Sequence, residues 1–151
     1  MAELKERLRA DLNAAMRARD QVRMRTLRMA LTSITNEEVA GTSARDLTDD
    51  EVVRVLTREA RKRREAAEAF GAAGRSDQAA AERAEGEVLA GYLPAQLSDD
   101  ELAALVDTAI AETGASSMSG LGQVMKTVTP RVAGRADGAR VAAEVRRRLS
   151  G

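Results

Sequence analysis

The sequence predicts an all-α protein, with an N-terminal helical bundle over residues 1–94 and a small three-helix domain over residues 95–151. Apolar residues make up 44% of the 151 residues, which is enough for a core, but aromatic residues make up only 1%. Leu, Val, Ala and Met must therefore fill the interior, and they suit close-packed helices better than a sheet. Apolar residues also recur at spacings of three and four, and no run alternates between apolar and polar as a half-buried strand does.

The first two predicted helices cover residues 2–18 and residues 20 to about 40. The apolar stripe of the first helix comprises Leu4, Leu8, Leu12 and Met16. The corresponding stripe of the second helix comprises Met24, Leu27, Leu31 and Ile34. Asp20 suits the N-cap of the second helix, and Gly41 with the polar residues after it ends that helix.

The third helix is predicted over residues 49–73, where Thr48 and Glu51 have the spacing of a capping box. Its expected buried side comprises Val53, Leu56, Ala60, Ala67 and Phe70. The fourth helix is predicted over residues 76–92, with a buried side of Ala80, Ala84, Val88 and Tyr92. Pro94 prevents much continuation of this helix, so residues 93–97 are the expected linker.

The middle of the third helix, residues 58–68, is strongly charged. The pairs at i,i+4 spacing are Glu59 with Arg63, Arg61 with Glu65 and Arg64 with Glu68. Such pairs support an exposed helix surface, so surface ion pairing is the interpretation we favour. Docking of a protein partner on this stretch is the alternative.

Three helices are predicted after the linker. A second capping box, Ser98 to Glu101, begins the fifth helix, whose apolar residues are Leu102, Leu105, Val106, Ala109 and Ile110. Gly114 is the expected C-cap.

The sixth helix, residues 120–129, presents Leu121, Val124, Met125 and Val128, and Pro130 ends or kinks it. Asp137 caps the seventh helix, which presents Val141, Val145 and Leu149.

The sequence offers no recognisable catalytic centre. It contains no cysteine and no histidine, which removes thiolate chemistry and the commonest general base and metal ligand. Its serines fall at helix caps and in loops, and its paired acids fall in first helical turns, where they favour the helix dipole. The loop containing Gly120 and Gly122 matches no phosphate-binding fingerprint. We therefore predict no catalytic residue, no metal site and no cofactor.

Charge is balanced overall but uneven along the chain. There are 24 basic and 24 acidic residues, so no global field draws the protein to nucleic acid or membrane. Residues 95–114 contain five acids and no base, whereas residues 115–151 contain seven bases and two acids. The seven cations are Lys126, Arg131, Arg135, Arg140, Arg146, Arg147 and Arg148. On one common edge they could contact RNA phosphates, and a solvated helix face is the alternative.

The location expected from the sequence is cytoplasmic. Residues 1–17 are amphipathic and contain acids, and they lack the apolar core of a signal peptide. No stretch approaches the roughly 18 consecutive apolar residues of a membrane helix. A membrane partner is therefore not expected.

Several short strings, in order and at consistent spacing, resemble those of the YqeY family over essentially the whole chain. They are Thr26-Leu27-Arg28-Met29, Lys62-Arg63-Arg64-Glu65, Ala73-Gly74-Arg75, Tyr92-Leu93-Pro94-Ala95-Gln96-Leu97-Ser98, Gly122-Gln123-Val124-Met125-Lys126 and Gly134-Arg135-Ala136-Asp137-Gly138. The family is related to the C-terminal tail of the B subunit (GatB) of the glutamyl/aspartyl-tRNA amidotransferase. That link lies mainly in the last third of the chain.

This resemblance implies a helical bundle followed by a C-terminal three-helix domain, and a role connected with tRNA. The amidotransferase tail is implicated in gripping tRNA, while the chemistry resides in other parts of that enzyme. The family-level label of carbon–nitrogen ligase activity, with glutamine as amide donor, would then be inherited by association. Three hypotheses follow: a tRNA-binding module, a protein-interaction adaptor in the tRNA-amidation or translation machinery, and an amidotransferase-type enzyme, the least favoured of the three.

Overall fold

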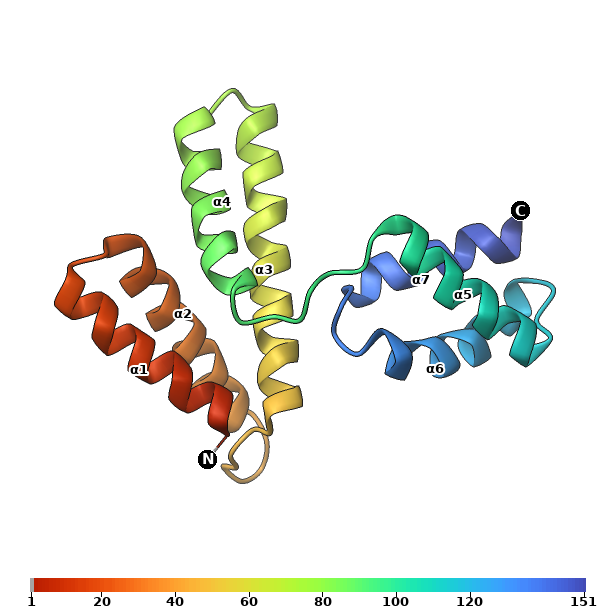
Figure 1. Ribbon diagram of the computed structural model, residues 1–151, viewed down its shortest axis with the longest axis horizontal. Helices are drawn as coiled ribbons and strands as arrows, with labels where there is room; N and C mark the ends of the chain where they lie inside the picture. Colours follow the sequence, from red (N-terminus) through yellow and green to blue (C-terminus); the bar gives the residue numbers. More distant parts are fainter. Residues whose placement is uncertain (1) are drawn as a thin grey trace. The chain divides into compact units, whose positions relative to one another are not determined.

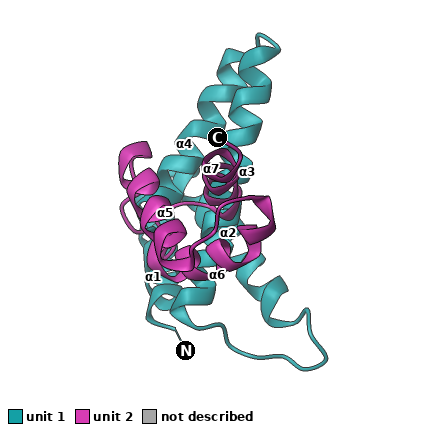
Figure 2. Cartoon of the chain, turned by 90° about the vertical axis from the view of Figure 1, so that its right-hand side faces the viewer, with its two compact units in different colours: residues 1–93 teal, residues 94–151 magenta. Residues whose placement is uncertain are grey.

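The computed structural model describes residues 2–151, and every regular element in that range is a helix. Contacts between Cα atoms divide the chain into two compact units, an N-terminal unit, Met1–Leu93, and a C-terminal unit, Pro94–Gly151 (Figure 2). The predicted all-α fold is therefore confirmed. The long apolar aliphatic stripes and the scarcity of aromatic residues indicated it correctly.

The N-terminal unit consists of two helical hairpins (Figure 1). The first pairs α1 (Glu3–Ala18) with α2 (Gln21–Glu38), and the second pairs α3 (Asp49–Ala72) with α4 (Ser76–Ala90). The hairpins pack on each other through α2 and α1 against α3, and through α2 against α4. Their shared core comprises Leu8, Leu27, Ala30, Ile34, Leu47, Val52, Val55, Leu56, Leu89 and Tyr92.

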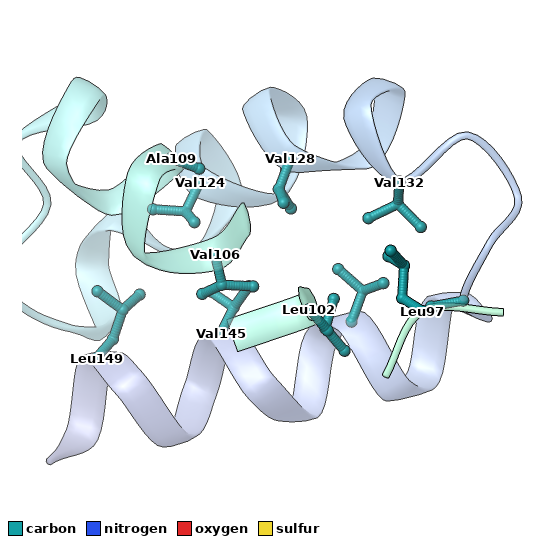
Figure 3. Close-up of a cluster of buried hydrophobic side chains, with 11 residues drawn as sticks. Leu97, Leu102, Val106, Ala109, Val124, Val128, Val132, Val145 and Leu149 are labelled. Carbon is teal, nitrogen blue, oxygen red and sulfur yellow. The ribbon is translucent and has the colours of Figure 1, made fainter. Parts of the chain in front are cut away.

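The C-terminal unit is a three-helix cluster of α5 (Asp99–Thr113), α6 (Leu121–Val132) and α7 (Gly138–Ser150), with a short 3-10 helix, η1 (Met118–Gly120), before α6. One face of each helix meets the others in a core of Val, Leu and Ala (Figure 3). Pro130 lies inside α6, which continues to Val132. Proline so close to a C-terminus removes one helical hydrogen bond and does not stop the last turn.

The side chains that the sequence indicated as N-caps make the expected capping hydrogen bonds. Thr48 and Ser98 each accept a hydrogen bond from the backbone N–H three residues on, and Glu51 and Glu101 reach back to complete both capping boxes. Asp20 accepts from the backbone N–H of Arg23, 3.1 Å away. These short-range interactions depend only on local spacing, so the sequence determines them.

Some buried positions differ from the predicted stripes. In α3, Leu56 and Ala67 are buried as predicted, but Val52, Val55 and Glu59 are buried as well, while Val53 is only half-buried. In α4 the buried residues are Ala79, Glu85 and Leu89, while Ala80 is exposed. Both helices contact more than one neighbour, so the direction of those neighbours, and not hydropathy alone, sets which flank is covered.

Candidate nucleic-acid interface

The seven predicted RNA-binding cations lie on α6, on α7 and in the turn between these two helices of the C-terminal unit. Val124, Val128 and Val132 of α6 are buried in the core with Val145 of α7 (Figure 3). Val141 of α7 is buried in the same core. This aliphatic core turns the cationic side chains outward, because residues between the buried positions of a helix face away from them.

Three arginines of α6 and α7 pair with acids of α5. Arg131 binds Glu112, and Arg140 binds Asp99 at 2.8 Å. Arg148 lies 3.4 Å from Asp107. The acid-rich predicted fifth helix and the basic segment after it therefore face each other.

Two further arginines also have carboxylate partners. Arg135, in the turn between α6 and α7, lies 3.8 Å from Glu101 and donates a hydrogen bond to the carbonyl of Ala95. Arg147 binds Glu144 on its own helix at 2.7 Å. The hydrogen bond from Arg147 is the main reason that the pKa of Glu144 is lowered, so this pair stays ionised at neutral pH.

Lys126 and Arg146 differ from the other five cations, because neither has an ion-pair partner among residues 2–151. Lys126 lies midway between Val124 and Val128 and is exposed, so it points away from the core. Arg146 and Arg148 lie on opposite flanks of the buried stripe of α7, and the contact with Asp107 marks the Arg148 flank as the α5 side. Arg146 therefore lies on the α6 side.

The positive charge of residues 115–151 is cancelled within the unit. Residues 94–151 contain seven basic and seven acidic residues. The five extra acids come from α5, and four of them take part in the ion pairs above. The seven cations therefore do not form one continuous positive edge, and their RNA-binding role remains a prediction.

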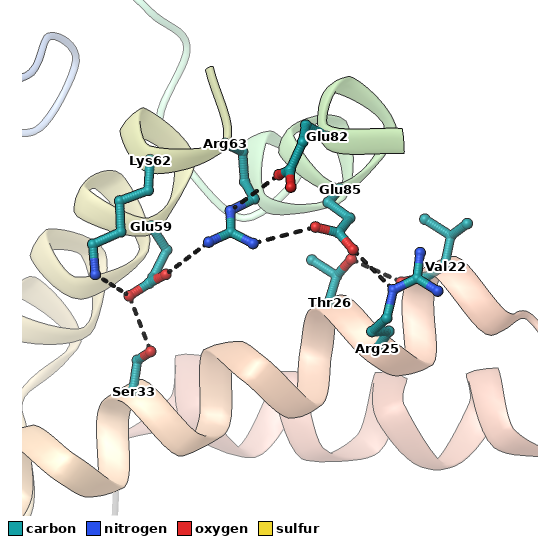
Figure 4. A network of polar contacts seen from close by, with 9 residues as sticks. All are labelled: Val22, Arg25, Thr26, Ser33, Glu59, Lys62, Arg63, Glu82 and Glu85. Atoms are coloured by element: carbon teal, nitrogen blue, oxygen red, sulfur yellow. Dashed lines mark hydrogen bonds and ion pairs between the residues drawn. The ribbon is translucent and has the colours of Figure 1, made fainter. Parts of the chain in front are cut away.

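The charged stretch of α3 forms a partly buried network rather than a purely exposed one (Figure 4). Glu59 is buried and accepts from Ser33 of α2 at 3.0 Å. Arg63 contacts Glu82 and Glu85 of α4 at 3.5 and 3.3 Å. The predicted i,i+4 pairs of Glu59 with Arg63 and Arg61 with Glu65 are present at 3.9 and 3.8 Å. The interpretation as surface pairing was incomplete, because these side chains join α2, α3 and α4.

The sequence did not indicate a group of polar contacts that Tyr92, just after α4, makes with α1 and α2. The Tyr92 hydroxyl donates to Asp11 of α1 at 2.5 Å and accepts from Arg23 of α2 at 3.3 Å. The Arg7 guanidinium carbon lies 4.6 Å from the centre of the ring. Burial and the Asp11 carboxylate raise the pKa of Tyr92 to about 12. Tyr92 thus fixes the last residues before the linker to the first hairpin.

In the described part of the chain, no helix is long and apolar enough to cross a membrane. No curated protein matches the chain. The family model for Yqey-like protein matches residues 5–149, which spans both units and all seven α-helices either in full or nearly so. The chain therefore belongs to the YqeY-like protein family.

Proposed function

We propose that the chain is a non-catalytic, tRNA-associated binding module whose C-terminal unit contacts the RNA backbone. The observation that carries this proposal is the pair Lys126 and Arg146. Both are exposed cations that have no ion-pair partner within the described residues, 2–151, and they belong to the two helices that resemble the tRNA-gripping tail of the amidotransferase. The chain would supply binding in tRNA amidation or translation, and the proposal assigns no amide transfer to it.

Arg147 is the best candidate for a third phosphate contact. Its side chain is 64% exposed, and its carboxylate partner lies on the same helix. An exposed ion pair contributes only about 0–1 kcal/mol, so a phosphate can replace the carboxylate at little cost. Arginine also binds phosphate with two parallel hydrogen bonds, which makes that exchange favourable.

The acids of α5 limit how large this interface is. Asp99, Asp107 and Glu112 are exposed beside their arginine partners, and they repel phosphates on that side of the unit. The RNA backbone is therefore expected on the flank shared by α6 and α7. Contacts to about three phosphates give a slope of log affinity against log salt of about −2 to −3.

A salt titration of tRNA binding by mobility shift tests the proposal. The variant Lys126→Gln with Arg146→Gln should weaken binding and make the salt slope about 2 units shallower, since two phosphate contacts are lost. Arg131→Gln with Arg140→Gln is the matched control, because it changes net charge equally but removes arginines that already bind acids. Equal slopes for the two variants would refute the proposal.

A protein-interaction adaptor without RNA contact is the second candidate, and the neutral charge of the C-terminal unit favours it. A neutral surface gives no long-range attraction to a polyanion. Recovery of a complex by pull-down from lysate, repeated after ribonuclease treatment, separates the candidates. A complex that survives ribonuclease and a purified chain that does not bind tRNA would together favour the adaptor.

A further inference from the structure

The first hairpin contains a basic surface that has not been neutralised. Residues 12–36, which include the α1–α2 turn, contain five arginines and one acid. The single acid, Asp20, is occupied as the N-cap of α2. This region therefore has a local excess of cations, as the basic C-terminal segment does.

The partners of the five arginines divide them into two groups. Arg25 binds Glu85 of α4 at 2.9 Å, and Arg23 donates to the hydroxyl of Tyr92. Arg17, Arg19 and Arg28 have no carboxylate partner among residues 2–151. We call these three side chains the hairpin basic face.

The hairpin basic face combines the outer surfaces of both helices at the turn. Leu8 and Ala15 turn one side of α1 into the core, which leaves Arg17 on the opposite side. Arg28 of α2 reaches across to the Sδ of Met16 at 3.4 Å, a contact with a neutral atom. Arg19 lies in the turn itself. Arg17 and Arg19 are therefore within three residues of Met16, the side chain that Arg28 contacts from α2.

The backbone at Arg19 is a second, independent feature of this face. Arg19 adopts the left-handed conformation, with φ of 57°, at the C-terminal end of α1. The ends of α3 and α5 use Gly74 and Gly114 for the same conformation, which glycine adopts without strain. Arg19, which has no carboxylate partner among residues 2–151, holds this conformation without a glycine, as Ala133 does at the end of α6. A left-handed arginine carries backbone strain that glycine avoids.

We propose that the hairpin basic face binds the phosphates of RNA. Arginine presents a planar fork that matches phosphate geometry, and the exposed neutral side chains on the same helices, Asn13 and Thr32, can add hydrogen bonds to phosphate or sugar oxygens. A lipid surface fits less well. Membrane-bound helices insert a broad apolar face, whereas here Leu8 and Leu27 are fully buried in the core and Met16 is the only large apolar side chain exposed in residues 12–36.

This inference goes beyond the proposed function, because the hairpin basic face lies in the N-terminal unit. It requires no contact by Lys126 or Arg146. A chain that binds RNA with both units would make two sets of phosphate contacts, and substitutions in one unit can remove one set without the other.

The test uses the full chain and unfractionated tRNA in a fluorescence-anisotropy salt titration. The triple variant Arg17→Gln, Arg19→Gln and Arg28→Gln should lose about tenfold or more in affinity, with a salt slope shallower by about 2 to 3 units. Its matched control is Arg45→Gln, Arg58→Gln and Arg61→Gln in the same unit. These arginines have carboxylate partners, and the net charge changes equally. Circular dichroism confirms that both variants remain helical.

An affinity and slope equal to those of the control would overturn the inference. So would binding of vesicles containing anionic lipid that depends on the three arginines while tRNA binding does not. The variant Lys126→Gln with Arg146→Gln is titrated in parallel. If only that variant weakens binding, the hairpin inference fails and the proposed function stands; if only the triple variant does, the proposed function fails and the hairpin inference stands.

Discussion

Two basic regions of this protein look alike in sequence and differ in structure. Residues 115–151 contain seven cations, and residues 12–36 contain five. In the C-terminal unit, five of the seven cations bind carboxylates, four of them across to α5. In the first hairpin, Arg17, Arg19 and Arg28 bind no carboxylate of the described part of the chain. The more basic segment therefore has the smaller share of cations available to a polyanion.

The difference shows that charge clustered along a chain is not charge clustered on a surface. Acids of α5 lie in a separate segment, and folding brings them against α6 and α7. In the first hairpin Arg25 likewise meets Glu85 of α4, whereas Arg17, Arg19 and Arg28 are exposed and meet no carboxylate among residues 2–151. Coulomb interactions fall with distance in space and are screened beyond about 10 Å, so neighbours in the fold decide the potential.

The largest expected effect is on the free energy of unfolding, and it concerns the buried ion pair of Lys5 and Glu38. Each of these buried charges needs the other for compensation. Lys5 donates to both carboxylate oxygens of Glu38 at 2.7 and 2.9 Å, and Glu38 also accepts from the N–H of Leu47. Lys5→Met leaves a buried carboxylate without its cation and should lower the free energy of unfolding by about 3 kcal/mol or more. Urea unfolding followed by circular dichroism measures this change.

The exposed pair of Arg131 and Glu112 provides the control for Lys5. Arg131→Met should change the free energy of unfolding by less than about 1 kcal/mol, because solvent screens this pair. Equal losses for Lys5→Met and Arg131→Met would show that burial does not distinguish the ion pairs of the two units.

The next effect tests whether α5 neutralises the C-terminal unit. Asp99→Asn, Asp107→Asn and Glu112→Gln together remove three acids that bind arginines. Arg131 and Arg140 are then released, while Arg148 keeps its 3.0 Å contact with Glu144 but loses the repelling acid beside it, so tRNA affinity should rise by about tenfold at low salt and the salt slope should steepen. Unchanged affinity in an anisotropy titration would mean that these arginines face away from bound RNA.

A smaller effect separates folding from binding at the α1–α2 turn. Arg19→Gly relieves the left-handed backbone strain and should raise the free energy of unfolding by about 0.5–1 kcal/mol. The same change removes a cation from the hairpin basic face, so tRNA binding should weaken. Thermal unfolding and anisotropy on one preparation measure both quantities. A loss of stability would contradict the assignment of strain to Arg19.

The smallest effect concerns pH and the two capping boxes. The hydrogen bond from Arg45, with that from Thr48, lowers the pKa of Glu51 from 4.5 to about 2. Because the folded pKa lies below the unfolded one, this stabilisation is fully present above pH 4.5 and is lost as pH falls toward 2. The pKa of Glu101 is also lowered, mainly by the backbone hydrogen bond at Ser98.

Urea unfolding at several pH values between 5 and 2 measures this contribution. Glu51→Gln should make stability depend less on pH across that interval, and Glu101→Gln is the corresponding change in the other unit. A Glu51→Gln variant with the same pH dependence as the native chain would show that the cap carboxylate has an ordinary pKa.

Several buried side chains could not be found from the sequence. Glu59 and Glu85 are charged residues in helices with clear polar character, yet both are buried. The guanidinium group of Arg63 contacts both carboxylates and compensates their charge. Met16 continues the stripe of Leu8 and Leu12 but is 39% exposed, because steps of four residues drift around a helix of 3.6 residues per turn and Ala15 takes the buried position instead. Periodicity identifies an apolar face, but it does not tell how far a neighbouring helix covers it.

The sequence by itself determined the local structure: the helices, the caps at Asp20, Thr48 and Ser98, and the stop at Gly114. These depend on interactions within four residues, which fixed spacing encodes. Only the tertiary structure decided which cations are neutralised, because that requires side chains distant in the sequence to meet. Arg131 met an acid and Arg28 did not, and no count of charges along the chain distinguishes them.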